Sequence, residues 1–316
     1  MLAVEIEKHA IRIGERFAVS LQRTLRIPDD GRRYPLPPGL GAFPLLKVED
    51  YRDSLPQHML KQGGVFIPMY QREALWLGFR AAAWKPNAIK VMLGGINAIT
   101  GTSEPPGTLC RLPQNYMVCP PQPWLDGINC GAESVRQFVA MPLGLGYTVE
   151  AAISHSETLG GIQVIVFAAK PGKFPDRPPE PAGPFSGKTA RPQANPALGI
   201  AAGGYMRQKI YPDPHPPDVW DASNYGCIFI HIVNSELYRE ITGLDPPATP
   251  IDAKTYTDSG LPWFDLYDEE LGDVPASEIL EEVKPITGQD KDKGITTAGE
   301  SITITEKQIK KLRPED

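Results

Sequence analysis

Proline is the feature that most limits how this chain can fold. The sequence contains 34 prolines among its 316 residues, which is roughly twice the usual share. Because proline fixes the backbone angle φ and has no amide hydrogen to donate, it ends helices and central strands. The sequence therefore predicts short elements joined by long, stiff connections.

Between the prolines lie short apolar runs. Residues 135–141 and 161–169 are rich in β-branched and aromatic side chains and are bounded by glycine or proline, a composition typical of core strands. Residues 146–153 alternate apolar and polar side chains, which indicates a half-exposed strand. Residues 227–233 form the most apolar run of the chain and predict a buried central strand.

Shorter patterns extend this interpretation. A helix is predicted over 71–83, because Glu73 falls in its first turn and Leu75, Trp76 and Phe79 share one face. Further strands are expected at 4–7, 10–13, 17–22, 65–70, 88–93, 116–119 and 205–211, and short helices at 235–241 (capped by Asn234 and Ser235), 252–259 and 277–284. The predicted fold class is α+β with β dominant: a mainly antiparallel β-sandwich or barrel with a few short helices and long proline-rich loops.

One stretch could divide the chain. Residues 171–196 hold many prolines and almost no apolar side chains, so they should form an extended or mobile connection. This connection is either a linker between two domains or a loop inserted into one. We expect a single large β-rich domain over 1–285, with an internal boundary at 171–196 as the alternative, and a polar C-terminal tail over 286–316 with one candidate strand at 302–305.

Charge and cysteine content narrow the functional classes. The net charge of −6 does not provide the broad basic surface of a nucleic-acid-binding protein. The N-terminal residues include acidic side chains where a signal peptide is apolar, and no window is long and apolar enough to insert into a membrane. The four cysteines lack CxxC spacing, so reduced thiols and a cytoplasmic location are expected.

The chain contains the passages RTLRIPDDG at 23–31, FIPMYQREA at 66–74, PWLDGI at 123–128, RQFVAMPLG at 136–144 and GLPWFD at 260–265. These passages resemble a group of uncharacterised bacterial and fungal proteins of unknown function. The resemblance covers most of the chain. It implies no activity, cofactor or catalytic residue.

Motifs for common chemistries are missing from the sequence. It has no dinucleotide-binding or phosphate-binding glycine loop, no zinc-protease motif and no EF-hand loop, and its five histidines lack the spacing of a metal site. No cofactor and no metal are therefore expected. His231 interrupts a predicted buried strand, and we interpret it as a neutral, hydrogen-bonded histidine rather than a catalytic one. A Cys–His enzyme would need Cys119 or Cys130 brought to His231 by the fold.

Three acidic residues suggest a different enzyme. Asp126, Asp265 and Asp268 lie near Trp124 and Trp263 in the sequence. Two carboxyl groups beside an aromatic platform are the elements of a glycoside hydrolase. The alternative, which we favour, is that both tryptophans anchor the core while the acids cap turns or stay solvated.

The aromatic residues also suit a binding role. Trp263, Phe264 and Tyr267 stand beside a run of acidic residues, a combination found where proteins meet. The leading hypothesis is a non-enzymatic binding or structural protein that acts through its surface loops, with a protein partner or a second copy of itself. The carbohydrate-active hydrolase is the alternative.

Overall fold

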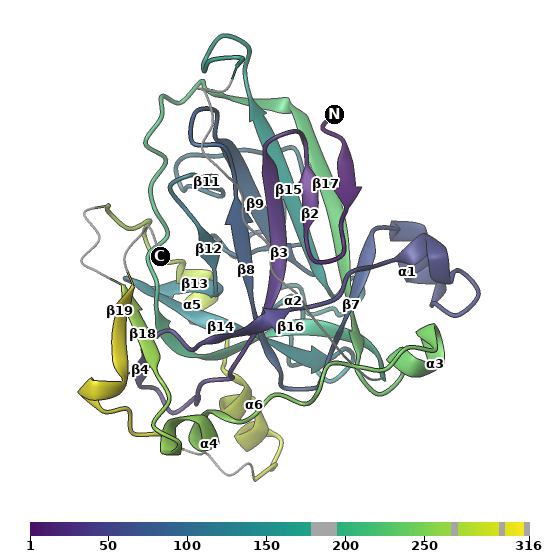
Figure 1. The fold of residues 1–316 in the computed structure, drawn as a ribbon, viewed down its shortest axis with the longest axis vertical. Helices are drawn as coiled ribbons and strands as arrows, with labels where there is room; N and C mark the ends of the chain where they lie inside the picture. The colour runs from purple at the N-terminus through teal and green to yellow at the C-terminus, as the bar shows by residue number, and fades with distance from the viewer. Residues whose placement is uncertain (178–194, 267–270, 297–300, 313–316) are drawn as a thin grey trace.

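The computed structural model describes residues 1–177, 195–266, 271–296 and 301–312. Within these residues the chain is dominated by strands, most of them joined in one large sheet (Figure 1). The strands of this sheet are β1 Val4–Ile6, β2 Ile11–Ile13, β3 Phe17–Thr24, β4 Arg33–Tyr34, β5 Gly39–Ala42, β6 Leu46–Lys47, β7 Val65–Met69, β8 Ala74–Arg80, β9 Asn87–Leu93, β10 Ile96–Asn97, β11 Met117–Cys119, β12 Trp124–Leu125, β13 Gly127–Gly131, β14 Ser134–Pro142, β15 Ile162–Ala169, β16 Asn195–Arg207 and β17 Trp220–Asn234.

The remaining elements are short. A second sheet pairs β18 Trp263–Leu266 with β19 Ile309–Leu312 in parallel. The helices are α1 Gln57–Gln62, α2 Val149–Ser154, α3 Tyr238–Thr242, α4 Ala253–Asp258, α5 Glu278–Glu281 and α6 Ile286–Asp292, with 3-10 turns η1 Val48–Tyr51 and η2 Glu306–Gln308. None of the helices in the described part of the chain has the length and apolarity needed to cross a membrane.

The main sheet is largely antiparallel. Its ladder runs from β1 through β2, β3, β8, β14, β16, β17 and β15 to β9, and each of these pairings is antiparallel. Among the described strands of this sheet, only β4 with β16 and β7 with β17 pair in parallel. The predicted β-dominant α+β class with mainly antiparallel strands is therefore confirmed. Neither sheet of the described residues closes on itself, so the predicted sandwich or barrel is not confirmed.

Alternation of side chains builds the core. Figure 1 shows β3, β8, β9, β15 and β17 running together in the upper part of the molecule, with β14 and β16 crossing below. Alternate residues of these strands face one shared interior: Ile89 and Val91 of β9, Val164 of β15, and Ile228 and Ile230 of β17. Residues on the opposite face of the sheet are buried in smaller clusters under loops and short helices. The sheet is therefore covered on much of both faces.

Two predicted elements are wrong. The predicted helix 71–83 is the strand β8, which lies between β3 and β14 and exchanges hydrogen bonds with both. The predicted strand 146–153 is largely the helix α2, because the Thr148 hydroxyl accepts a hydrogen bond from the Ala151 amide and caps it. In both places the short apolar pattern fits both a helix and a strand. Contacts with neighbouring segments decide which of the two forms.

The last part of the chain also differs from the prediction. Residues 286–292 form α6, and the described residues after it are not a structureless tail. The strand expected at 302–305 is wrong, since β19 lies at Ile309–Leu312 instead. Ile302 is buried in the main core. The helix expected after residue 234 begins later, as α3, and no side chain caps its first turn.

The proline-rich stretch joins two parts of one sheet. β15, which precedes it, pairs with β17, which follows it. Residues 178–194 lie outside the described residues.

Candidate functional site

Asp126 is buried beside Trp124. The Trp124 indole Nε1 donates a hydrogen bond to Asp126 Oδ2 at 2.6 Å, and the Asp126 amide donates to Gln208 Oε1 at 2.9 Å. Only 5% of Asp126 is exposed. Burial raises the pKa of this carboxyl to about 7, although the Trp124 hydrogen bond opposes the rise. Asp126 can therefore hold a proton near neutrality, but almost none of it reaches solvent.

Trp263 and its neighbours lie on β18. Trp263 is fully buried, and its indole Nε1 donates to Thr257 Oγ1 at 3.1 Å, so no face of the ring is open to a sugar. Phe264 exchanges backbone hydrogen bonds with Leu36. Asp265 forms an ion pair with Arg207 at 3.5 Å. The other two predicted site residues, Tyr267 and Asp268, lie outside the described residues.

Segments 124–126 and 263–265, each with a tryptophan and an aspartate, lie near the same short stretch of chain. Gln208 contacts Asp126, and its neighbour Arg207 contacts Asp265. Their carboxyl groups differ in environment. Asp126 is buried, whereas the side chain of Asp265 is partly exposed. A pair of glycosidase carboxyls must flank an open cleft, and neither Asp126 nor Asp265 lines either of the two cavities described below.

His231 is held inside the fold. Its Nε2 lies 3.0 Å from the carbonyl oxygen of Gly63, and its ring stacks on Phe229 with centroids 4.5 Å apart. Burial lowers the pKa of His231 to about 4. Burial also raises the pKa of the Cys119 and Cys130 thiols to about 12. Neither thiol carries the charge that a nucleophilic cysteine needs near neutral pH.

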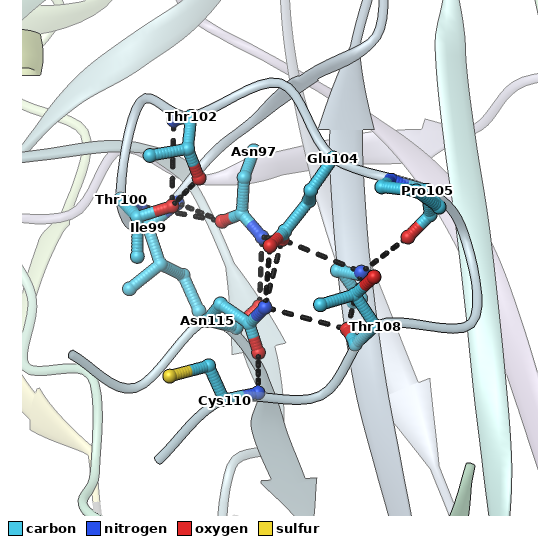
Figure 2. Close-up of polar contacts among 10 residues, drawn as sticks. Asn97, Ile99, Thr100, Thr102, Glu104, Pro105, Thr108, Cys110 and Asn115 are labelled. Atoms are coloured by element: carbon cyan, nitrogen blue, oxygen red, sulfur yellow. Dashed lines mark hydrogen bonds and ion pairs between the residues drawn. The ribbon is translucent and has the colours of Figure 1, made fainter. Parts of the chain in front are cut away.

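A polar network that the sequence analysis missed lies around Lys90 (Figure 2). Lys90 is a central residue of β9 and is fully buried. Its ammonium group donates to the Thr108 carbonyl at 2.6 Å and the Pro105 carbonyl at 3.2 Å, and it lies 3.3 Å from Glu104 Oε1. Desolvation lowers the pKa of Lys90, and the Glu104 carboxylate opposes that fall.

Two asparagines complete this network. Figure 2 shows the side chains of Asn97 and Asn115 converging on the Glu104 carboxylate. The Asn97 amide donates to Glu104 Oε1 at 2.9 Å, and the Asn115 amide donates to both carboxylate oxygens at 2.8 Å. The Asn115 side-chain oxygen also accepts from the Cys110 amide. These bonds fix the loop of residues 98–116 to the outer face of the sheet. The sign of this network in the sequence was a charged lysine in the middle of the apolar run 88–93.

The fixed loop borders an apolar groove. The groove has a volume of about 480 Å³ and lies between Leu112, Pro113, Pro212, Pro275 and Ile279. We call it the loop groove. Leu112 is 90% exposed and Ile279 is 45% exposed. One cation, Arg111, and two anions, Asp213 and Glu278, also line it.

The described residues contain no group of three or more histidine, cysteine, aspartate or glutamate side chains arranged to hold a metal ion. Comparisons with protein-family models, with curated proteins and with solved structures found no match.

Proposed function

We propose that this chain is a non-enzymatic binding protein that associates with a second copy of itself through the loop groove. The observation that carries the proposal is the exposure of Leu112 and Ile279 on the rim of an apolar groove. Large apolar side chains gathered at one exposed place are typical of protein-binding surfaces.

The rigidity of the groove supports this function. The Lys90–Glu104 network holds the loop that carries Leu112 before any partner arrives. A surface that is already ordered loses less conformational entropy on binding, and more of the contact energy appears as affinity.

A second copy fits the charges of the groove. In a two-fold contact the same patch meets itself, so a residue on one copy faces a different residue on the other. Arg111 is held by the carbonyl oxygens of Asp213 and His215 and lies 3.6 Å from the Asp213 carboxylate, while Glu278 is exposed at the groove. Arg111 of each copy would then face Glu278 of the other.

The environments of the candidate catalytic residues also favour binding over catalysis. His231 and Asp126 are buried and hydrogen-bonded, and Cys119 and Cys130 are buried. The net charge of −6 supports a protein partner rather than a nucleic acid. All four cysteines are free thiols, which agrees with the cytoplasmic location that we infer.

The test is the oligomeric state of groove variants. We expect sedimentation velocity to show dimers of the wild-type chain, and Leu112→Asp and Ile279→Asp to dissociate them, because each places a charge in an apolar contact. Leu145→Asp is the matched control, since Leu145 is 52% exposed but does not line the loop groove. A monomeric wild-type chain, or equal effects of all three substitutions, would refute self-association through this groove.

A glycoside hydrolase remains the second candidate, because a carboxyl with a pKa of about 7 is suited to act as a general acid. Hydrolysis of nitrophenyl glycosides that is abolished by Asp126→Asn would support it against the binding protein. Absence of hydrolysis by the wild-type chain would dismiss it.

A further inference from the structure

The edge of the main sheet opens between β1 and β17. The two segments are joined at one end, where the Leu2 amide donates to the Tyr225 carbonyl at 3.1 Å. Further along β17, from the Ile230–Val65 pair onward, the neighbouring strand is β7 instead of β1. Between these two points no described strand pairs with this edge of β17. A cavity of about 450 Å³, lined by Val4, Ile6 and Cys227 among others, fills the gap. We call it the β1–β17 slot.

One edge of the β1 backbone pairs with β2, and the other edge faces the slot. The Glu7 amide donates to the Ala10 carbonyl, and the Gly14 amide donates to the Ala3 carbonyl. These bonds show that odd-numbered residues of β1 face β2. Because successive residues of a strand direct their backbone groups to opposite edges, the amide and carbonyl groups of Val4 and Ile6 face the slot.

The backbone of β17 faces the slot from the other side. The Tyr225 carbonyl points toward β1, where it accepts from Leu2. The Phe229 carbonyl points to the same edge, since a Cβ on Gly64 would lie 2.1 Å from its oxygen. Cys227 lies midway between these two residues. The same alternation directs its amide and carbonyl into the slot. On the β17 wall, Cys227 is therefore the residue whose backbone lies between the Leu2 contact and Gly64.

The side chains around the slot divide by polarity. Val4, Ile6 and Ile228 pack against or belong to the main core. Lys47, Glu49 and Arg52 also line the slot. Lys47 and Glu49 lie 3.8 Å apart and offset each other, whereas no ion pair of Arg52 occurs in the described part of the chain. Arg52 therefore gives the lining of the slot a net positive charge, which favours an acidic ligand.

We propose that the β1–β17 slot binds an extended segment of a partner protein, in which apolar and acidic residues alternate. About three residues of the segment would pair with both β1 and β17 as an added strand, a known mode of peptide recognition. Alternate side chains of a strand point to opposite faces. The apolar ones contact Val4, Ile6 and Ile228, and the acidic one pairs with Arg52. This site is separate from the loop groove and does not depend on it.

The probe is a fluorescent five-residue peptide that alternates valine with glutamate, and fluorescence anisotropy measures its binding to the full chain. Arg52→Glu should weaken binding by about fivefold or more, because it turns an ion pair into a repulsion. Arg80→Glu is the matched control: Arg80 is also exposed but does not line the slot. A peptide that alternates valine with lysine should bind more weakly than the acidic one.

Hydrogen exchange tests the backbone pairing directly. The amides of Ile6 and Cys227 should exchange rapidly in the free chain and become protected when the acidic peptide is added. Ile6→Pro should abolish binding, since it removes a donor that faces the slot and leaves the bonds to β2 intact. In a Cys110→Ser background, the peptide should also slow the reaction of the exposed Cys227 thiol with a thiol reagent. This last measurement needs no change to the strands.

Several results would overturn the proposal. One is no binding of the acidic peptide, and another is binding without protection of the Ile6 and Cys227 amides. Equal weakening by Arg52→Glu and Arg80→Glu would show general charge attraction instead. Dimers that Ile6→Pro dissociates, with no peptide bound, would identify a second copy as the occupant. Because Leu112→Asp leaves the slot unchanged, peptide binding by this variant separates the slot from the loop groove.

Discussion

Burial controls the chemistry of individual ionisable residues in this protein. Asp126 and Lys90 lie in the interior, and burial shifts the pKa of each toward its neutral form. His231 is shifted in the same sense and stays neutral down to about pH 4. The sequence showed which residues can titrate, but only the fold showed which of them are removed from water.

Asp126 should make the stability of the chain depend on pH. The unfolded carboxyl loses its proton near its ordinary pKa of 3.8, whereas the folded one keeps it to about 7. The folded state therefore binds more protons between these values, and the free energy of unfolding falls as pH rises from 4 to 7. Above pH 7 this loss is complete.

Asp126→Asn should remove that dependence. Relative to wild type, we expect its free energy of unfolding to rise from pH 4 to pH 7 by up to roughly 4 kcal/mol. Urea denaturation at several pH values measures the difference. Asp53→Asn, at an exposed position, controls for the change in net charge. A constant difference between Asp126→Asn and wild type over this range would contradict the raised pKa.

At the scale of elements, neighbouring strands decide what a short apolar pattern becomes. Leu75, Leu77 and Phe79 of β8 all face the core, which is a period of two. The predicted helix instead placed Leu75, Trp76 and Phe79 on one face. A seven-residue stretch supports both assignments, and the ladders with β3 and β14 decide for the strand.

The buried cation Lys90 is one of the groups that hold the loop of residues 98–116 in position. Lys90→Met should lower the free energy of unfolding by about 3–5 kcal/mol, because it leaves the Glu104 carboxylate near the interior without its positive partner. Adding Glu104→Gln to Lys90→Met should recover part of that loss, which a double-mutant cycle measures.

Lys8→Met, at an exposed position, is the control for the loss of a lysine. Limited proteolysis should cut the loop of residues 98–116 faster in Lys90→Met than in wild type. If Lys90→Met unfolds at the same denaturant concentration as Lys8→Met, the network does not hold the loop.

At the scale of the whole molecule, the last described residues complete structure that begins much earlier in the chain. β19 pairs with β18, whose Phe264 bonds to Leu36. Ile302 enters the main core. Such contacts between distant segments follow from how the whole chain folds back, and the polar composition of the last residues concealed them.

Ile302→Ala tests whether the last described residues stabilise the fold. We expect it to lower the free energy of unfolding by about 2–4 kcal/mol, since it leaves a cavity in the core. Ile295→Ala, which shortens an exposed isoleucine, should change stability little, and thermal unfolding compares the two. Equal, small effects would mean that residues 301–312 add little to the fold.

The sequence by itself determined the β-dominant class, because proline limits helices and period-two apolar runs require sheets. It also located the strands at β7, β9, β11, β15 and the second half of β17, whose patterns are strong enough to decide locally. Tertiary structure alone decided that β8 is a strand, that Lys90 and Glu104 meet, and that β1 and β17 part to leave a slot. These features depend on which distant segments become neighbours, and local patterns carry no record of that choice.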